Sequence, residues 1–350
     1  MTSRAPARAR ASAVGIDLDD PMVAAAVADG LTRAEQVLEQ AVAHADGYIS
    51  GVSGHLVAAG GKRFRPLLTL LAGQLGPSAR AADGSYRDRA LDDVVKAAVV
   101  VELTHLASLY HDDVMDEALL RRGADSANAR YGNTVAILTG DLLFARASQL
   151  VSELGAQAVR LQAETFERLC TGQIRETVGP ASGEDPVDHY LGVLAEKTGS
   201  LIATAGHFGA QFSGCDDSTV AVLRQYGEQI GVAFQLADDL IDLVSESSDS
   251  GKTPGTDLRE GVPTLPVLLA RRSTDPADAR LLELLDDDLD DDDRHREALR
   301  LLRAHPSMAE AQAVTEGWAH EARASLEPLP DSPVKTALQD LALAVVHRAG

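Results

Sequence analysis

The order of hydrophobic and polar residues predicts a chain that is helical over most of its length. Apolar side chains recur every three or four positions, as at Leu31, Ala34 and Leu38, which places them on one face of an α-helix. The helices predicted from this repeat cover residues 24–49, 67–75, 90–117, 134–154, 156–178, 185–196, 200–212 and 218–244, with three or four more after residue 263.

The composition favours an all-α fold in one domain. Of the 350 residues 45% are hydrophobic but only 4% aromatic, so the core is built mainly of Ala, Leu and Val, and Ala and Leu are strong helix formers. No Pro/Ser-rich linker and no internal repeat interrupts the helical pattern. We therefore expect a single domain over residues 19–350, after an Arg- and Ala-rich tail (residues 1–18) that is expected to be disordered.

The charge and the cysteines exclude several classes of protein. A net charge of −21 argues against a nucleic-acid partner, because binding to phosphate backbones needs a basic surface. Cys170 and Cys215 form no CxxC pair and predict neither a zinc site nor a disulfide framework, which fits a reducing cytoplasm. The apolar segments are shorter than the roughly 20 residues of a membrane span, so we expect a soluble cytoplasmic protein without a transmembrane segment.

Two aspartate motifs with the same spacing are the strongest candidates for chemistry. Residues four apart lie on one edge of a helix, so the first and last aspartate of a DDxxD motif present two carboxylates together. Such an edge suits Mg²⁺, which prefers oxygen ligands and is usually held by a few carboxylates together with substrate phosphate. The motifs are Asp112, Asp113 and Asp116 in HDDVMD, and Asp238, Asp239 and Asp242 in ADDLID, each at the end of a predicted long helix.

A third acidic stretch, residues 286–293, also matches the DDxxD spacing. It holds seven aspartates and is followed by Arg294, His295 and Arg296. No apolar wall or anion-binding loop lies nearby in the sequence, so we interpret this run as a solvated acidic turn.

Residues 60–66, GGKRFRP, are a candidate anion site. Two glycines allow close backbone approach, and Lys62, Arg63 and Arg65 precede a predicted helix start. A basic loop that only aids solubility is the alternative for this motif taken alone.

Together and in this order, GGKRFRP, DDVMDEALLRRG and FQLADDLID resemble the trans-polyprenyl diphosphate synthases of the bacterial all-E, medium- and long-chain type. The resemblance extends over residues 60–268 and includes EKTGSL (196–201) and GK…GTDLREG…TLP (251–266). It implies an isoprenoid synthase helical bundle around a deep central cavity, with the aspartate motifs facing each other across its mouth. It also implies Mg²⁺ as cofactor, isopentenyl diphosphate and an allylic diphosphate as substrates, and a homodimer.

The resemblance assigns roles to single residues. Asp112, Asp116 and Asp238 would bind the magnesium ions that hold the allylic diphosphate, with Asp113, Asp239 and Asp242 as further ligands or as partners of the ligands. Arg121 would contact the allylic diphosphate, and Lys252 would close over it. The isopentenyl diphosphate site would be formed by Lys62, Arg65, His105 and Arg122. The residues near the reacting carbons would be Lys197, Thr198 and Gln235.

One position departs from the family pattern. Many relatives carry a lysine in the turn before TLP, where this chain has Val262. That contact is therefore either missing or supplied by Arg259.

The helix before the first motif bears on product length. Going back from Asp112, the helical stripe contains Ser108, His105, Thr104 and Val101, and Ala107 is also small. Its first turn has no Phe or Tyr, whereas short-chain relatives carry Phe or Tyr there. We expect a medium- or long-chain product of the kind used for a quinone side chain, such as that of menaquinone. The alternatives are that these small residues only pack against a neighbouring helix, and that the enzyme makes geranylgeranyl or farnesyl diphosphate.

Two other classes of protein share some of these features. A class I terpene cyclase also ionises an allylic diphosphate, but it needs no second cationic site such as Lys62, Arg65 and Arg122. A regulatory subunit without activity would be expected to lose aspartates, yet all six are present. Whether the product is released at a membrane stays open.

Overall fold

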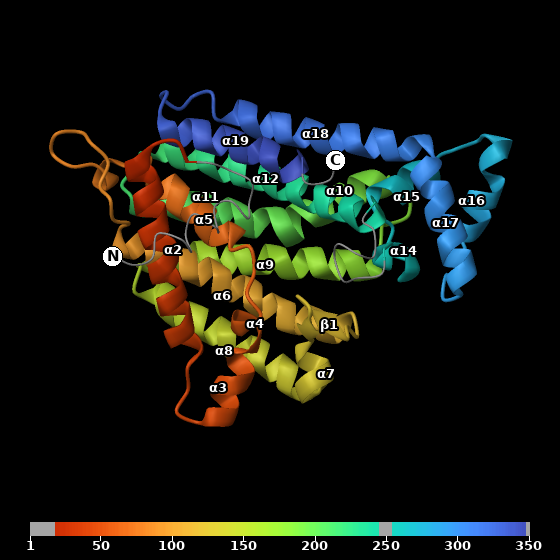
Figure 1. Cartoon of the computed structure of the whole chain (residues 1–350), viewed down its shortest axis with the longest axis horizontal. Coiled ribbons are helices and arrows are strands. Elements are labelled where there is room, and N and C mark those ends of the chain that lie inside the picture. The colour runs from red at the N-terminus through yellow and green to blue at the C-terminus, as the bar shows by residue number, and fades with distance from the viewer. Residues whose placement is uncertain (1–17, 245–253, 348–350) are drawn as a thin grey trace.

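The computed structural model describes residues 18–244 and 254–347 and is built almost entirely of α-helices (Figure 1). The tail predicted for residues 1–18 lies, apart from Leu18, outside the described residues. The long helices are α2 (Pro21–Val42), α5 (Phe64–Gly73), α6 (Asp92–Met115), α8 (Asn133–Ser152), α9 (Ala156–Val178), α10 (Pro186–Leu194), α11 (Ser200–Phe212), α12 (Asp217–Val244), α17 (Asp292–Ala304), α18 (Pro306–Ser325) and α19 (Pro333–His347). The short elements are α3 (Gly47–Ser53), α4 (His55–Ala58), α7 (Ala127–Tyr131), α14 (Thr256–Arg259), α15 (Leu265–Ala270), α16 (Ala279–Leu285), the 3₁₀ turns η1 (Pro77–Ala79) and η3 (Pro276–Asp278), the π-helix η2 (Ala195–Gly199) and the strand pair β1 (Leu120–Arg121) and β2 (Ala124–Asp125).

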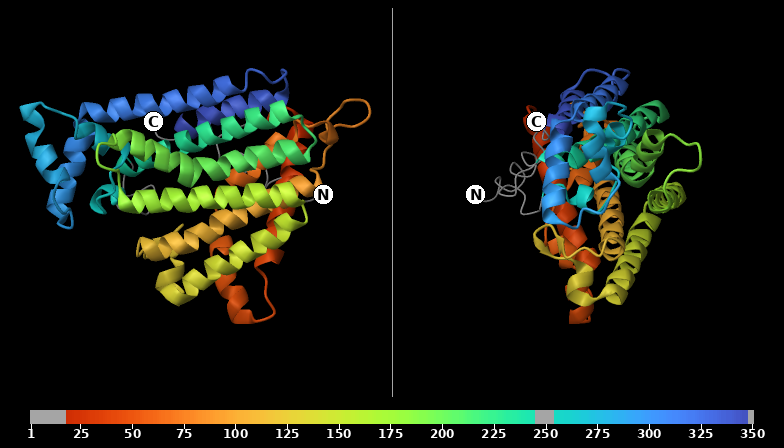
Figure 2. Two further views of the ribbon diagram at one scale, coloured as in Figure 1. Left: turned by 180° about the vertical axis from the view of Figure 1, so that it is seen from behind. Right: turned by 90° about the vertical axis from the view of Figure 1, so that its right-hand side faces the viewer.

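The bundle is arranged around α6 and α11, and both are buried along most of their length. α6 packs against α8, α5, α11 and α2, and α11 packs against α12, α5 and α9. Helices α18 and α19 cover the outer side of α12 (Figures 1 and 2). The main core is aliphatic, as composition predicted: Leu68, Leu70 and Leu71 of α5 and Val100 and Leu103 of α6 are all fully buried. The predicted all-α fold class is confirmed.

The predicted helix over residues 24–49 is interrupted. α2 ends at Val42, and a new helix begins at Gly47, because the carboxylate of Asp46 accepts hydrogen bonds from the amides of Tyr48 and Ile49. Such a side chain satisfies amides that have no partner within the helix. The apolar repeat continues through the break, so periodicity alone did not reveal it.

The break predicted between residues 196 and 200 is absent. The π-helix η2 joins α10 to α11 without interruption. At this point α12 comes very close: a Cβ atom on Gly231 would lie 2.8 Å from the Cα of Gly199. A π-helix widens the turn locally and is frequent at functional sites.

The region after residue 263 holds more helices than the three or four predicted. The additional elements, such as α15 and α16, span only six and seven residues, too few for a periodic signal. They enclose a second, smaller core formed by Leu243, Leu258, Leu284, Leu299 and Leu302. This core joins the end of α12 to α14, α16 and α17.

The start of α5 is fixed by a buried ion-pair network. Arg63, with φ +50°, is only 5% exposed, and its guanidinium contacts Glu35 at 2.7 Å and Glu102 at 2.9 Å. The helix therefore begins at Phe64, earlier than predicted, and Pro66 lies in its first turn, where proline needs no amide partner. Arg63 links α2, α5 and α6.

We predict that Glu102→Ala destabilises the protein by about 3 kcal/mol, because it leaves the buried Arg63 with less compensation. The matched control is Glu153→Ala, which removes the exposed Lys96–Glu153 pair (2.6 Å) and should cost less than about 1 kcal/mol. Both free energies of unfolding are measured by urea denaturation. Equal effects in the two variants would contradict the role assigned to the Arg63 network.

Candidate active site

The first aspartate motif lies at the C-terminal end of α6, as predicted, but its three carboxylates face different surroundings. Asp113 is fully buried and accepts hydrogen bonds from Arg121 Nε at 2.6 Å and from the amide of Ala127 at 3.2 Å. Asp113 thus anchors the β1–β2 hairpin, which the sequence analysis did not predict. This leaves Asp112 and Asp116 as the outward pair.

The hairpin positions Arg121 beside the motif. Its Nη2 lies 3.7 Å from Oδ2 of Asp116, while its Nε stays bonded to Asp113. Arg121 therefore holds a fixed cation next to the outward carboxylates. Its contact with the allylic diphosphate stays a prediction.

Lys197 approaches the same carboxylates from η2. Its Nζ contacts Oε2 of Glu176 on α9 at 2.6 Å. Burial alone would lower the pKa of Lys197, but Glu176, Asp112 and Asp116 together raise it above the usual value. Sequence reasoning identified Lys197 and missed Glu176, whose distance of 21 residues along the chain gave no signal.

The charged forms of the outward carboxylates are disfavoured, chiefly because the two side chains are partly buried. Burial, with repulsion from Asp116, raises the pKa of Asp112 to about 6, although Lys197 and Arg121 act in the opposite direction. The pKa of Asp116 is also raised, chiefly by burial. A site with this property favours an added cation.

The second motif ends α12, and its middle aspartate is again buried. Asp239 is 8% exposed; it accepts hydrogen bonds from the hydroxyl of Tyr190 and, at 2.9 Å, from Nε2 of Gln235. Oγ1 of Thr198 in turn donates to Oε1 of Gln235 at 3.2 Å. Burial raises the pKa of Asp239 to about 6. Thr198 and Gln235 thus lie together beside this motif, and Tyr190 is a partner that sequence reasoning missed.

The other two aspartates of this motif have separate contacts. Asp238 interacts electrostatically with Arg65 of the basic loop. Asp242 accepts a hydrogen bond at its Oδ2 from the amide of Asp257 at 3.1 Å.

The basic loop is folded around Arg122. Nη1 of Arg122 donates to the carbonyl oxygens of Leu56 and Gly60. A Cβ atom on Gly61 would lie 2.9 Å from this guanidinium, and Gly60 has φ +81°, so both positions require glycine. Lys62 extends over the ring of Phe234 on α12, with Nζ 5.8 Å from the ring centroid.

The cations of this loop are crowded. Burial, together with repulsion from Arg122, lowers the pKa of Arg65 to about 10. Burial and the surrounding arginines also lower the pKa of His105 well below its usual value, so its imidazole is neutral near pH 7. Lys62, Arg65, His105 and Arg122 are thus gathered in one place. Arg63, also in the predicted anion cradle, points into its buried ion pairs instead.

The residues predicted to control chain length lie along one side of α6 but have different neighbours. Ser108 and Thr104 lie below Asp112, and Oγ1 of Thr104 accepts a hydrogen bond from Nε2 of Gln162 on α9 at 2.6 Å. Ala107 shares its face with His111 and lies where α6 approaches Gly140 of α8: a Cβ on that glycine would be 3.1 Å from the Ala107 carbonyl. For Ala107 the tight packing favours the simpler role of helix contact.

Aromatic residues from other helices lie near this stripe. The ring of Phe144 on α8 lies 5.7 Å from that of His111 and 4.2 Å from that of Phe166 on α9, measured between centroids. Phe144 and Phe166 come from other helices, so the spacing of residues along α6 could not reveal them.

Two residues predicted near the second motif, Lys252 and Arg259, differ in what the structure shows of them. Lys252 lies outside the described residues. Arg259 contacts Asp292 at 2.7 Å. That contact favours the first of the two alternatives for Val262, namely that the relatives' lysine contact is missing here.

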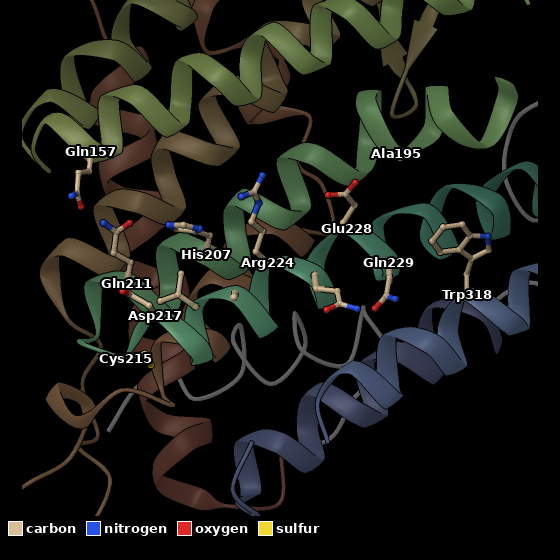
Figure 3. A pocket seen from close by; sticks show the side chains of 13 residues that line it. Gln157, Ala195, His207, Gln211, Cys215, Asp217, Arg224, Glu228, Gln229 and Trp318 are labelled. Atoms are coloured by element: carbon tan, nitrogen blue, oxygen red, sulfur yellow. The ribbon is translucent and has the colours of Figure 1, made fainter. Parts of the chain in front are cut away.

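A groove of about 760 Å³ lies elsewhere, where α11 and α12 approach α9 and α18 (Figure 3). His207, Arg224, Glu228 and Trp318 are among its lining residues. None of the predicted site residues lines it, so this groove is separate from the aspartate motifs.

The donor set fits a hard divalent cation, because every motif ligand is a carboxylate oxygen. Within residues 18–244 and 254–347, no three His, Cys, Asp or Glu side chains lie close enough to enclose a metal ion by themselves. An ion here would take part of its coordination from another oxygen-rich group, and a diphosphate supplies such oxygens.

Comparisons with known proteins agree with this geometry. The family model described as polyprenyl synthetase matches residues 46–302. The chain is 52% identical over 336 residues to nonaprenyl diphosphate synthase of Mycobacterium tuberculosis (strain ATCC 25618 / H37Rv), covering 96% of this chain and 97% of that protein.

Two solved structures are similar over nearly the whole chain. One is geranylgeranyl pyrophosphate synthase from Corynebacterium glutamicum, complexed with calcium and isoprenyl diphosphate (TM-score 0.83, 44% identity, 96% and 100% of the two chains). The other is a decaprenyl diphosphate synthase from Rhodobacter capsulatus (TM-score 0.82, 32% identity, 94% and 98%). The resemblance seen in the motifs is confirmed, and the chain belongs to the polyprenyl synthetase family.

Proposed function

We propose that this chain is a magnesium-dependent prenyltransferase that adds isopentenyl diphosphate, head to tail, to an allylic diphosphate and forms an all-trans polyprenyl diphosphate. The observation that carries the proposal is the pairing of two unlike anion sites. Asp112, Asp116 and Asp238 offer carboxylates for metal-bound diphosphate, and the cluster of Lys62, Arg65, His105 and Arg122 offers cations for a second diphosphate without metal. Arg65 and Asp238 interact electrostatically across the two sites.

The residues of the site stabilise a leaving group and need no protein nucleophile. Magnesium, when bound, would neutralise the allylic diphosphate as its C–O bond ionises. Lys197 and Arg121 add fixed positive charge at the same carboxylates, where charge develops on the departing oxygen. The double bond of isopentenyl diphosphate attacks the allylic cation, and loss of a proton, for which the released diphosphate is the acceptor, restores an allylic diphosphate one unit longer.

Positioning and exclusion of water fall to the uncharged residues. Thr198 and Gln235 are tied to each other and to Asp239, so they hold a fixed polar edge beside the second motif. The neutral imidazole of His105 offers a hydrogen bond without adding to the repulsion among the arginines. An allylic cation reacts with water, so the apolar walls around the site protect it.

The cationic cluster argues against a class I terpene cyclase, which binds a single diphosphate. A regulatory subunit is disfavoured because both motifs keep two accessible carboxylates and a buried partner. The acidic surface fits a cytoplasmic enzyme. So do Cys170 and Cys215, which form no CxxC pair.

We infer a medium or long product, for a quinone side chain such as that of menaquinone. The similarity to nonaprenyl diphosphate synthase supports this length, and so does the small side chain of Ser108, one turn below Asp112, where no Phe or Tyr blocks the stripe. The Thr104–Gln162 hydrogen bond crosses from α6 to α9 one turn further down. A prenyl product that grows along this stripe must pass or displace the Thr104–Gln162 hydrogen bond. This hydrogen bond is therefore the barrier that we expect to limit product length.

We also infer a homodimer that forms through α8 and α9. These two neighbouring helices expose Ile137, Leu138, Val159, Ile174 and Val178, and apolar side chains gathered on a surface mark an interaction site. Helix α8 is long and apolar enough to cross a membrane, but in this fold it packs along α6. A partner surface accounts for the exposed side of α8 without a membrane.

We predict that Asp112→Asn and Asp238→Asn each lower turnover by about 10²- to 10³-fold, because each removes a carboxylate that would hold the metal. Turnover is measured with labelled isopentenyl diphosphate, an allylic primer and Mg²⁺, and a chelator should abolish it. The control Asp293→Asn, in the acidic run, should keep the wild-type rate. A hydrocarbon or terpenol formed from the allylic diphosphate alone would instead indicate a cyclase.

We predict opposite changes in product length for two substitutions. Ser108→Phe should shorten the products, because a ring fills the first turn below Asp112, and Gln162→Ala should lengthen them, because the contact with Thr104 is lost. Product masses are determined for each variant. Thr165→Val, which removes the buried Thr165–Thr204 bond (2.7 Å) between α9 and α11, serves as control. Unchanged masses in both test variants would exclude this stripe as the channel.

We predict that Leu138→Asp, at a side chain 61% exposed on α8, converts the dimer into a monomer, because it places a charge in the apolar interface. Molar mass is measured by light scattering after size-exclusion chromatography. Met22→Asp on α2, at a side chain 41% exposed, should leave the mass unchanged. A wild-type protein that is already monomeric would rule out the interface.

A further inference from the structure

The acidic run of residues 286–293 holds a specific partner. Nη2 of Arg259 contacts Oδ1 of Asp292 at 2.7 Å, and Nη1 of Arg259 donates to the carbonyl oxygen of Asp290 at 3.3 Å. Arg259 also lowers the pKa of Asp292 through the hydrogen bond between them. The end of α14 is therefore fastened to the start of α17, 33 residues further along the chain.

A second contact from α17 reaches the beginning of α14. His295 is only 2% exposed, and its Nε2 lies 2.9 Å from the carbonyl oxygen of Gly255. Its Nδ1 lies 3.3 Å from Nη2 of Arg259. An arginine only donates and a carbonyl only accepts, so these partners select the neutral imidazole with its hydrogen on Nε2.

Gly255 is adapted to this contact. It has φ +70°, a conformation that favours glycine, and a Cβ atom there would lie 3.1 Å from both Nε2 of His295 and Cδ1 of Leu299. The side chains of α17 thus pack directly against the backbone that precedes α14.

The fastened segment leads directly to the second aspartate motif. The amide of Gly255 donates to the carbonyl oxygen of Asp242 at 2.8 Å, and the amide of Asp257 donates to the carboxylate of Asp242 at 3.1 Å. From the other side, Nε of Arg303 on α17 donates to the carbonyl oxygen of Leu243 at 2.6 Å. Both the carboxylate of Asp242 and the helix end that carries it are therefore connected to α17.

We propose that the Arg259–Asp292 ion pair and the His295–Gly255 hydrogen bond form a clamp that positions the carboxylate of Asp242 for the metal-bound diphosphate. Arg259, His295 and Asp292 are positioning residues, since they act through residues 255–257 and do not themselves reach the substrate. The acidic run then has a defined role, and Arg259 serves the second motif indirectly. The catalytic part of this proposal rests on the proposed prenyltransferase function.

The energetics separate this role from a purely structural one. Asp292 has a side chain that is 78% exposed, so its ion pair contributes little to global stability. Its loss should loosen residues 254–262 while the small core beneath α17 stays intact. Greater mobility of residues 254–262 without a loss of global stability is therefore the result that we expect of a clamp.

The first experiment measures amide hydrogen exchange in the full-length protein without metal or substrate. Arg259→Ala and Asp292→Asn should each speed exchange over residues 254–262 by about threefold to tenfold, and the double variant should be no worse than the single ones. The matched control is Arg280→Ala, which removes a two-point contact with Glu297 on the same α17 (3.1 and 2.6 Å) and should leave this segment unchanged. Unaltered exchange in both test variants overturns the clamp.

The second experiment measures steady-state kinetics of the same variants. The Mg²⁺ concentration for half-maximal rate and KM for the allylic diphosphate should rise about fivefold. KM for isopentenyl diphosphate should not change, because its cationic cluster lies on the basic loop, α5, α6 and the hairpin, away from α14 and α17. Faster exchange with unchanged Mg²⁺ dependence overturns the link to Asp242. An inactive wild-type protein refutes the proposed function, and the exchange experiment still judges the clamp on its own.

Discussion

The arrangement of the site depends on how the protein accommodates several carboxylates that lie close together at the ends of α6 and α12. Both motifs use the same solution: the middle aspartate is turned inward and bound by the protein, and the outer ones face the site. Asp113 is held by Arg121 and the Ala127 amide, and Asp239 by Tyr190 and Gln235. The inward aspartates fix the geometry, so that the outer carboxylates remain close together despite their repulsion. An added cation relieves that repulsion, which couples the fold to the chemistry.

A similar division separates the neighbouring arginines of the basic loop. Arg63 adopts a left-handed conformation and turns into the core toward Glu35 and Glu102, whereas Arg65 stays at the site with a lowered pKa. One residue anchors the loop and the other serves the ligand. The glycines at positions 60 and 61 complete this arrangement because Arg122 packs against their backbone.

Local sequence patterns predicted much of the fold and of the site. The rest depends on contacts between residues that are far apart in the sequence, which those patterns do not show. The ends of α6, α9 and α12 and the gathering of the basic residues follow from periodicity and motif order, because those signals lie in contiguous sequence. The partners Glu176 and Tyr190 approach the site from other helices, so no spacing marks them. The hairpin after α6 and the short helices after residue 263 were missed because their stability comes from the contacts of Asp113 and from the second core, not from an apolar repeat.

The acidic run shows why spacing alone does not define a metal site. It repeats the DDxxD interval, yet its carboxylates are neutralised nearby: Asp287 by Arg294 and Asp292 by Arg259, and these contacts lower both pKa values. At Asp112 the pKa is raised, because burial outweighs the cations around it. A lowered pKa marks a carboxylate whose charge nearby groups already stabilise, whereas a raised pKa here reflects burial of the charge, as it also does at the inward Asp239. The arginine contacts of Asp287 and Asp292 therefore separate this run from Asp112, which shares its partly buried helix end with Asp116.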